Sequence, residues 1–160
     1  MNYKLICADI DGTLLNSEKR LLPQVKRSLQ EAAAAGIQIA LVSGRMPSGV
    51  DFVEMQLGLD CIKVCNAGTY ILMGDRCIGA EYLPNRIMKE IYRKIAVKNG
   101  IPLWIFRNRE WFVSGMDDFI EKEIGFVAYE PELVDVEKFA ESWEMEKKRP
   151  NKLLLAASPD

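Results

Sequence analysis

Apolar and polar positions along the chain predict an alternation of strands and helices. Residues 5–10 are almost continuously apolar, which indicates a buried strand. Apolar side chains then recur at helical spacing in residues 23–35, at Val25, Leu29 and Ala33. Gly36 follows, a residue suited to a left-handed helix cap, and residues 37–42 form a second apolar strand. This strand-helix-strand order predicts parallel neighbouring strands with a right-handed crossover.

The same pattern continues to about residue 82. It predicts a helix at 47–57, a strand at 62–65, and a hairpin with strands at 69–73 and 77–80. From about residue 83 the elements change to longer helices and aromatic strands. They are helices at 84–99, 117–124 and 134–143 and strands at 102–107, 111–114 and 152–157. The helix at 84–99 places three isoleucines on one side, Ile87, Ile91 and Ile95.

Two carboxylates stand where the first strand gives way to a turn. Asp9 and Asp11 are two positions apart, so they share one face, while Ile10 between them points into apolar surroundings. Gly12 supplies the permissive backbone of a sharp turn, and amides in this turn can form a concavity that binds anions. Two facing carboxylates favour a hard cation with oxygen ligands, and Mg2+ is the ion expected.

An EF-hand calcium loop also begins with two aspartates at this spacing. That loop requires Gly at its sixth position and Glu at its twelfth, and counting from Asp9 these positions hold Leu14 and Arg20. The calcium-loop alternative is therefore excluded. A turn that is merely rich in Asp and Gly explains neither the spacing nor the apolar strand before it.

A second polar segment follows the strand at 37–42. Ser43, Gly44 and Arg45 come directly after it. The ends of parallel strands open on the same edge of a sheet, where ligands of open α/β sheets bind, so this segment is expected beside Asp9. The Ser43 hydroxyl and the Gly44 amide are suitable donors to an anionic oxygen. Arg45 either contacts a substrate phosphate or is a solvated charge at the start of the next helix.

The run Asp9-Ile-Asp-Gly-Thr-Leu-Leu15 resembles the signature of the haloacid dehalogenase-like superfamily, most of whose members are phosphohydrolases. The resemblance implies that Asp9 is the nucleophile and Asp11 the general acid/base, and that both help to hold Mg2+. It also implies that Ser43 binds the transferring phosphoryl group. Gly12 and Thr13, in the same turn, are candidates for phosphate binding.

Asn66-Ala67-Gly68 resembles the Asn-Gly-Ala turn of the Cof-type branch of that superfamily, although Gly and Ala are in the opposite order. In that branch an α+β cap is inserted in the core. We therefore expect an α/β fold in which residues 1–82 form the N-terminal part of a Rossmann-like parallel-sheet core and residues 83–160 part of the cap. Asn66 either approaches the substrate or serves the turn itself.

The family completes its site with a lysine on a later core strand and an acidic loop. Neither has a convincing match before residue 160, so the chain is expected to be an N-terminal portion of a longer design, with an open sheet edge that favours self-association. In a second interpretation the chain is a compact member without a large cap. The acidic loop is then 114–118, and Lys63 or Lys98 is the lysine.

Composition narrows the chemistry further. The chain of 160 residues has a net charge of −2, which argues against nucleic acid as a partner. It contains no histidine, which excludes Ser-His and Cys-His catalysis. No window is long and apolar enough for a membrane span, and we expect a cytoplasmic protein. The four cysteines lack zinc-type spacing and are expected to be buried, reduced thiols.

Two functions from different classes remain. The first is a Mg2+-dependent phosphohydrolase that acts on small phosphorylated metabolites through an aspartyl-phosphate. The second is a non-catalytic module that binds metal and phosphate or pairs with another polypeptide.

Overall fold

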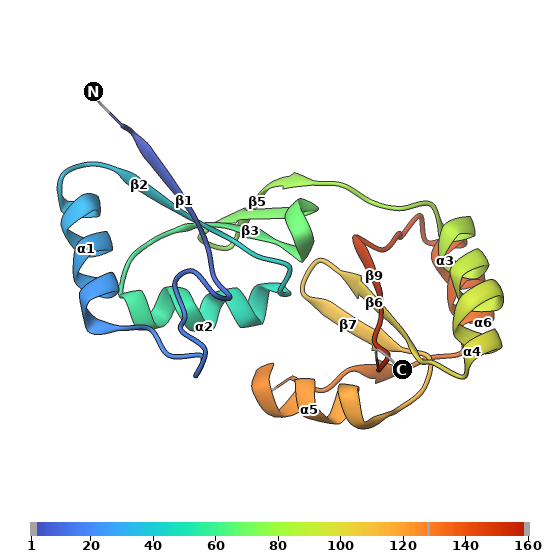
Figure 1. The fold of residues 1–160 in the computed structure, drawn as a ribbon. Coiled ribbons are helices and arrows are strands. Elements are labelled where there is room, and N and C mark those ends of the chain that lie inside the picture. The colour runs from blue at the N-terminus through green and yellow to red at the C-terminus, as the bar shows by residue number, and fades with distance from the viewer. Residues whose placement is uncertain (1–2, 128, 159–160) are drawn as a thin grey trace. The chain divides into compact units, whose positions relative to one another are not determined.

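The structure is a computed structural model that describes residues 3–127 and 129–158. The chain divides into two compact units, Met1–Ala80 and Glu81–Asp160, each with its own sheet and its own hydrophobic cluster (Figure 1). The division falls close to the boundary that the change in sequence pattern indicates.

The first unit is built on a five-stranded sheet. Its strands are β1 (Leu5–Asp9), β2 (Gln38–Val42), β3 (Ile62–Cys65), β4 (Tyr70–Met73) and β5 (Arg76–Ala80). They lie in the order β1-β2-β3-β4-β5, with β1, β2 and β3 parallel and β4 and β5 antiparallel. The parallel neighbouring strands and the hairpin predicted from the sequence are confirmed.

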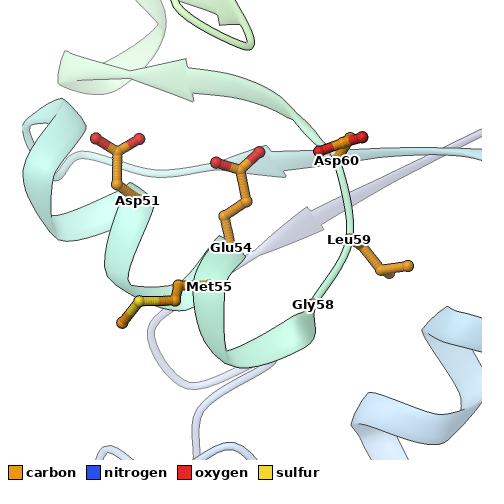
Figure 2. Close-up of a pocket in the computed structure, with 6 residues that line it drawn as sticks. All are labelled: Asp51, Glu54, Met55, Gly58, Leu59 and Asp60. Carbon is orange, nitrogen blue, oxygen red and sulfur yellow. The ribbon is translucent and has the colours of Figure 1, made fainter.

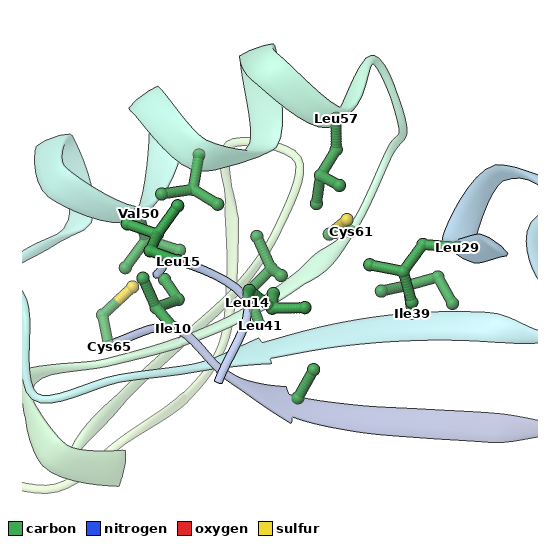
Figure 3. Packing of buried hydrophobic residues seen from close by; sticks show 12 residues of the cluster. Ile10, Leu14, Leu15, Leu29, Ile39, Leu41, Val50, Leu57, Cys61 and Cys65 are labelled. Atoms are coloured by element: carbon green, nitrogen blue, oxygen red, sulfur yellow. The ribbon is translucent and has the colours of Figure 1, made fainter. Parts of the chain in front are cut away.

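Helices α1 (Pro23–Ala34) and α2 (Pro47–Leu57) both begin with proline, which costs no hydrogen bond in the first turn of a helix. Gly58 ends α2 with a left-handed φ of 66°. Both helices pack on one face of the sheet (Figure 3). Leu41 of β2 and Val50 of α2 are fully buried there. Each such side chain stabilises the fold by about 1.5–3 kcal/mol, and this cluster holds the ends of β1 and β2 in place.

The opposite face of the first sheet is exposed at β1. Ala8 and Ile10 are buried, whereas Leu5, Cys7 and Asp9, which alternate with them, are exposed. Among the described residues β1 pairs with β2 alone, so its other side presents unpaired backbone groups. The open sheet edge expected from the sequence is therefore β1.

The second unit contains a four-stranded sheet with order β8-β7-β6-β9. Its strands are β6 (Leu103–Arg107), β7 (Glu110–Val113), β8 (Glu132–Leu133) and β9 (Lys152–Leu155), and its helical elements are α3 (Asn85–Ile91), η2 (Tyr92–Ala96), α4 (Val97–Asn99), α5 (Asp118–Val127) and α6 (Val136–Met145). The pattern did not predict β8, which has only two residues and pairs parallel to β7.

The helix expected at 84–99 is interrupted. Residues Tyr92–Ala96 form a turn of π-helix, which adds one residue to the helical repeat and rotates the residues that follow. Ile95, expected on the apolar side with Ile87 and Ile91, is consequently 43% exposed, and Ala96 is buried in its place.

The aromatic residues of the β6–β7 hairpin belong to the core, as expected. Trp104, Phe106 and Trp111 are each at most 4% exposed and contact one another, with the rings of Phe106 and Trp111 stacked at a centroid distance of 5.9 Å. The ammonium of Lys152 lies 4.6 Å from the ring centre of Phe106. The other side of this sheet packs against α3 and α6.

All four cysteines are free thiols, but only Cys61 and Cys65 are buried. The expectation of burial is wrong for Cys7 and Cys77 because β1 has an exposed face and β5 lies at the other edge of the sheet. Within residues 3–127 and 129–158, no helix combines the length and apolar character that a bilayer crossing needs.

Candidate functional site

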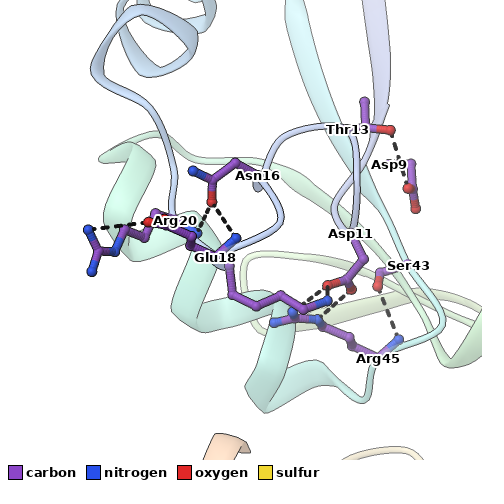
Figure 4. A network of polar contacts seen from close by, with 9 residues as sticks. Asp9, Asp11, Thr13, Asn16, Glu18, Arg20, Ser43 and Arg45 are labelled. Atoms are coloured by element: carbon purple, nitrogen blue, oxygen red, sulfur yellow. Dashed lines mark hydrogen bonds and ion pairs between the residues drawn. The ribbon is translucent and has the colours of Figure 1, made fainter.

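Asp9 and Asp11 lie at the carboxyl end of β1, on either side of the fully buried Ile10. Both carboxylates are on the exposed side, and Thr13 Oγ1 lies 3.4 Å from Asp9 Oδ2 (Figure 4). Gly12, with a φ of 80°, forms the turn, and its amide donates to Leu15 O at 3.2 Å. The turn therefore presents the two acids and Thr13 on one surface.

The carboxylate of Asp11 is held by two cations. Arg45 donates from Nε to Oδ2 at 2.8 Å and from Nη2 to Oδ1 at 2.7 Å, and Lys19 Nζ lies 2.7 Å from Oδ1 (Figure 4). The bond from Arg45 contributes most to lowering the pKa of Asp11 to about 2, Lys19 adds to it, and burial opposes both. In this arrangement Asp11 is a firmly ionised carboxylate.

Lys19 is a site residue that the sequence argument did not find. It lies in a short loop in which the side-chain oxygen of Asn16 accepts from the amides of Glu18 and Arg20, at 3.0 and 2.9 Å. Lys19 itself has a left-handed φ of 59°, uncommon for a residue with a side chain. The loop thus holds the ammonium over Asp11, and no motif in the sequence marks this position.

The segment after β2 lies beside Asp11, as its place on the sheet edge predicts. The register pairs Asp9 with Val42, one residue before Ser43, and Arg45 reaches Asp11 directly. Ser43 is 5% exposed, and its hydroxyl accepts a hydrogen bond from the Arg45 amide at 3.1 Å, which leaves its own proton to donate. Arg45, for which the sequence leaves two interpretations, binds the carboxylate of Asp11 in this structure.

Asn66 supports this segment from the next strand end. It belongs to a tight 3-10 turn, η1 (Asn66–Gly68), and is fully buried. Its amide donates to Arg45 O at 2.8 Å, and the Ala67 amide donates to Ser43 O at 3.1 Å. The turn at 66–68 therefore fixes the backbone that carries Ser43 and Arg45.

The donor set at this edge suits Mg2+. Asp9 and Asp11 supply hard carboxylate oxygens, and Mg2+ is commonly held by one or two carboxylates together with waters and substrate phosphate. No group of three or more acidic, Cys or His side chains that would enclose a metal is found in the described part of the chain. The two carboxylates thus fit Mg2+ by their chemistry, while both oxygens of Asp11 are bound to Arg45 and Lys19 in this structure.

A polar pocket of about 350 Å³ lies elsewhere on the first unit, beside α2 (Figure 2). It is lined in part by three acids, Asp51, Glu54 and Asp60. Buried Lys63 of β3 binds Asp51 at 2.6 Å and Glu54 at 2.8 Å. Burial, the largest influence, lowers the pKa of Lys63, but the hydrogen bonds that Lys63 Nζ donates to these two carboxylates outweigh it and raise the pKa. In this structure the ammonium of Lys63 therefore pairs with two carboxylates of α2.

The acidic segment of the compact alternative lies in the second unit, between β7 and α5. Asp117 Oδ1 accepts from the Ile120 amide at 2.9 Å, and Asp118 is the first residue of α5. Acids in these positions satisfy free amides and favour the helix dipole. Their contacts are accounted for by the start of a helix.

The sequence is similar to a known protein family and to curated proteins of that family. The sequence profile of the haloacid dehalogenase-like hydrolases matches residues 6–160. The pyridoxal phosphate phosphatase YbhA of Escherichia coli is 38% identical over 71 residues, which are 44% of this chain and 26% of that protein. The chain thus matches well under half the length of this curated relative.

Solved structures share the fold. A protein from Thermotoga maritima superposes with a TM-score of 0.75 at 19% identity, covering 99% of this chain and 58% of that one. A sugar phosphatase of subclass IIB superposes with a TM-score of 0.74 at 21% identity, covering 92% of this chain and 56% of that one. The α/β architecture expected from the sequence is confirmed.

Proposed function

Because this chain belongs to the haloacid dehalogenase-like hydrolase family, we propose that it is a Mg2+-dependent phosphohydrolase of small phosphorylated metabolites. The observation that carries the proposal is the pair of hydrogen bonds from Arg45 to Asp11, which joins the segments after β1 and β2 into one site. Phosphatases and a sugar phosphatase among the similar proteins agree with this class of substrate.

Each residue of the site has a part in the proposed reaction. The carboxylate of Asp9 attacks phosphorus, and the bond to the alcohol oxygen breaks as the aspartyl-phosphate forms. Asp11 gives a proton to the departing oxygen and later takes one from the water that hydrolyses this intermediate. A bound Mg2+ would reduce the repulsion between the Asp9 carboxylate and the anionic phosphate.

The remaining residues bind the phosphoryl group. In this proposal the hydroxyls of Thr13 and Ser43 and the amide of Gly44 supply donors to its oxygens. The amide of Gly12 joins them by giving up its hydrogen bond to Leu15 O. Arg45 has to exchange at least one bond to Asp11 for a phosphate oxygen, and Asp11 must lose cationic contacts before it can carry a proton near neutral pH. Substrate binding and activation of Asp11 are thereby the same event.

The second unit, Glu81–Asp160, is proposed to be the cap of the Cof-type branch. It begins two residues before the boundary at 82/83 that the sequence predicts. A helix, a hairpin and further helix-strand pieces, as found in residues 83–160, make up an α+β cap of that kind. In this proposal the cap selects the leaving group, and Asn66 acts through the backbone of Arg45.

Turnover of p-nitrophenyl phosphate tests the function. The purified chain should hydrolyse this ester with Mg2+ and lose activity when EDTA removes the metal. Asp9→Asn should lower kcat by at least about a thousandfold, since the residue is the nucleophile. Asp60→Asn, an exposed acid of the separate pocket beside α2, is the matched control and should retain activity. Equal activity of Asp9→Asn and wild type would exclude the mechanism.

The open edge of β1 favours a second candidate, an interaction module that pairs with a further strand. Unpaired backbone groups and the exposed Leu5 are the features that support it. A second copy of the chain can supply such a strand. Light scattering after size exclusion should then show a dimer that dissociates in Leu5→Lys. A monomer at every concentration would remove this candidate.

A further inference from the structure

The second unit has a basic pocket of about 380 Å³ that the proposed reaction does not use. It is lined by Glu81, Tyr82, Arg107, Lys147 and Arg149, so three cations face one carboxylate. The lining comes from three separate stretches of chain, which are residues 81–82, the end of β6, and the connection between α6 and β9.

Buried Asn151 ties these stretches together. Its side-chain amide donates to Glu81 O at 2.7 Å, its side-chain oxygen accepts from the Asn108 amide, and its own amide donates to Phe106 O at 2.8 Å. With an exposed fraction of 2%, this side chain is shielded from water, which strengthens its bonds. The pocket walls are therefore fixed relative to one another.

The two exposed cations are also presented by a defined turn. Lys147 has a left-handed φ of 56°, and the Lys148 amide donates to Trp143 O at 2.8 Å as α6 ends. Asn85 Nδ2 holds Lys148 O at 2.9 Å. Lys147 and Arg149 flank this anchored residue.

The charges of the pocket are not fully compensated by the protein. Across the described ranges of the chain, neither Lys147 nor Arg149 takes part in an ion pair. Arg107 Nη1 lies 3.2 Å from Glu110, but its Nε is buried and has no hydrogen-bond acceptor within the described residues. A buried donor without an acceptor is costly, and an anionic ligand would satisfy it.

From these features we infer that the pocket binds a small phosphate- or carboxylate-bearing anion at a site separate from Asp9. Guanidinium groups match the paired oxygens of such anions, and the Tyr82 hydroxyl, 2.9 Å from Asn108 Oδ1, adds a polar group to the wall. The volume suits a metabolite-sized ligand. A polymer such as nucleic acid needs a longer basic surface than these three side chains provide.

Titration of the whole 15N-labelled chain with inorganic phosphate at constant ionic strength tests the inference. Saturable shifts of the amide signals of residues 82, 107 and 147–151 are expected. The double variant Lys147→Gln/Arg149→Gln should weaken that binding by at least about tenfold, because charged hydrogen bonds are lost. Shifts near Gly12 and Ser43, which report the other site, should remain.

The control carries the same change of charge elsewhere. Lys94→Gln/Lys98→Gln removes two exposed cations from the helix that contains η2, outside the pocket. If this variant weakens binding as much as the pocket variant does, the effect is general charge screening and the inference is wrong. The inference is also wrong if the amide signals of the second unit stay unchanged at a phosphate concentration that saturates the shift of the Ser43 signal. Tyr82→Phe, which removes only a hydroxyl, provides a milder variant should the double variant misfold.

The anion can arrive alone or as part of a substrate. In either case KM for p-nitrophenyl phosphate, which reports the Asp9 site of the first unit, should be the same in the double variant and in wild type, because the pocket belongs to the second unit. The phosphate titration does not require the protein to be catalytically active. A failure of the pocket to bind phosphate can therefore be distinguished from a failure of the proposed hydrolysis.

Discussion

Arg45 holds both carboxylate oxygens of Asp11 although 34 positions separate the two residues. The contact exists because parallel strands β1 and β2 end side by side, and because η1 fixes the backbone of Arg45. It makes the ionisation of Asp11 depend directly on a residue that we propose also binds the substrate phosphate.

Replacing Arg45 by Met should raise the pKa of Asp11 from about 2 towards the ordinary value of 3.8, because the largest stabilising contact of its charged form is lost. The pKa of Asp11 is depressed on folding, so its contribution to stability is complete above the unfolded pKa and is lost as pH falls through the folded one. Wild type should therefore lose about 1 kcal/mol of stability, after solvent screening, between pH 4 and 2, and the variant, in which Lys19 still lowers the pKa of Asp11, should lose less. Carboxyl 13C shifts against pH measure the pKa, and an unchanged value would contradict the assignment.

Removal of Lys19 should tighten Mg2+ binding. Its ammonium lies 2.7 Å from Asp11 Oδ1 and competes there with any cation, so Lys19→Met should lower the Kd for Mg2+ several-fold. Calorimetric titration of the metal gives the affinity. Lys4→Met is the matched control in the same unit. A weaker affinity in Lys19→Met would mean that Lys19 supports the site by organising its loop.

Lys63→Met should destabilise the first unit by about 2–3 kcal/mol, since it leaves Asp51 and Glu54 close together without their buried cation. Urea unfolding provides the measurement. The double variant Lys63→Met/Glu54→Leu should recover part of the loss because it removes one of the two unpaired acids. A loss no larger than that of an exposed lysine such as Lys4 would show that the pair contributes little.

Alkylation should separate the cysteines into two classes. Cys7 and Cys77 are exposed and should react with iodoacetamide at pH 8 in the folded protein. Cys61 should be protected, because burial, reinforced by Glu54 and Asp60, raises its pKa to about 11. Mass spectrometry of the labelled peptides distinguishes them, with the urea-unfolded protein as the control in which all four react. Early labelling of Cys61 in the native state would contradict its burial.

Much of the site could be predicted because it follows from strand order. Apolar runs before Asp9 and Ser43 identify two strands, and a helix between them requires the strands to be parallel, which brings their ends together. Lys19 could not be found in this way. Its position depends on a left-handed residue and on two hydrogen bonds to Asn16 within a loop, and neither leaves a periodic signal.

The other differences have local causes of the same kind. The strand β8 is too short for alternation to be visible and depends on pairing with β7. Cys7 is exposed because it points to the uncovered face of β1, and which face of a sheet is covered depends on the packing of other elements, not on the strand's own residues.

The π-helical turn Tyr92–Ala96 bears on how the sequence can vary among relatives. In such a turn, one extra residue is inserted into an α-helix and the helix continues on both sides of it. A relative lacking one codon within this stretch would form an unbroken α-helix, and its isoleucine stripe would continue in phase past position 91. Relatives can therefore differ here by the insertion or deletion of one residue, because only this one turn has to change between π-helical and α-helical geometry.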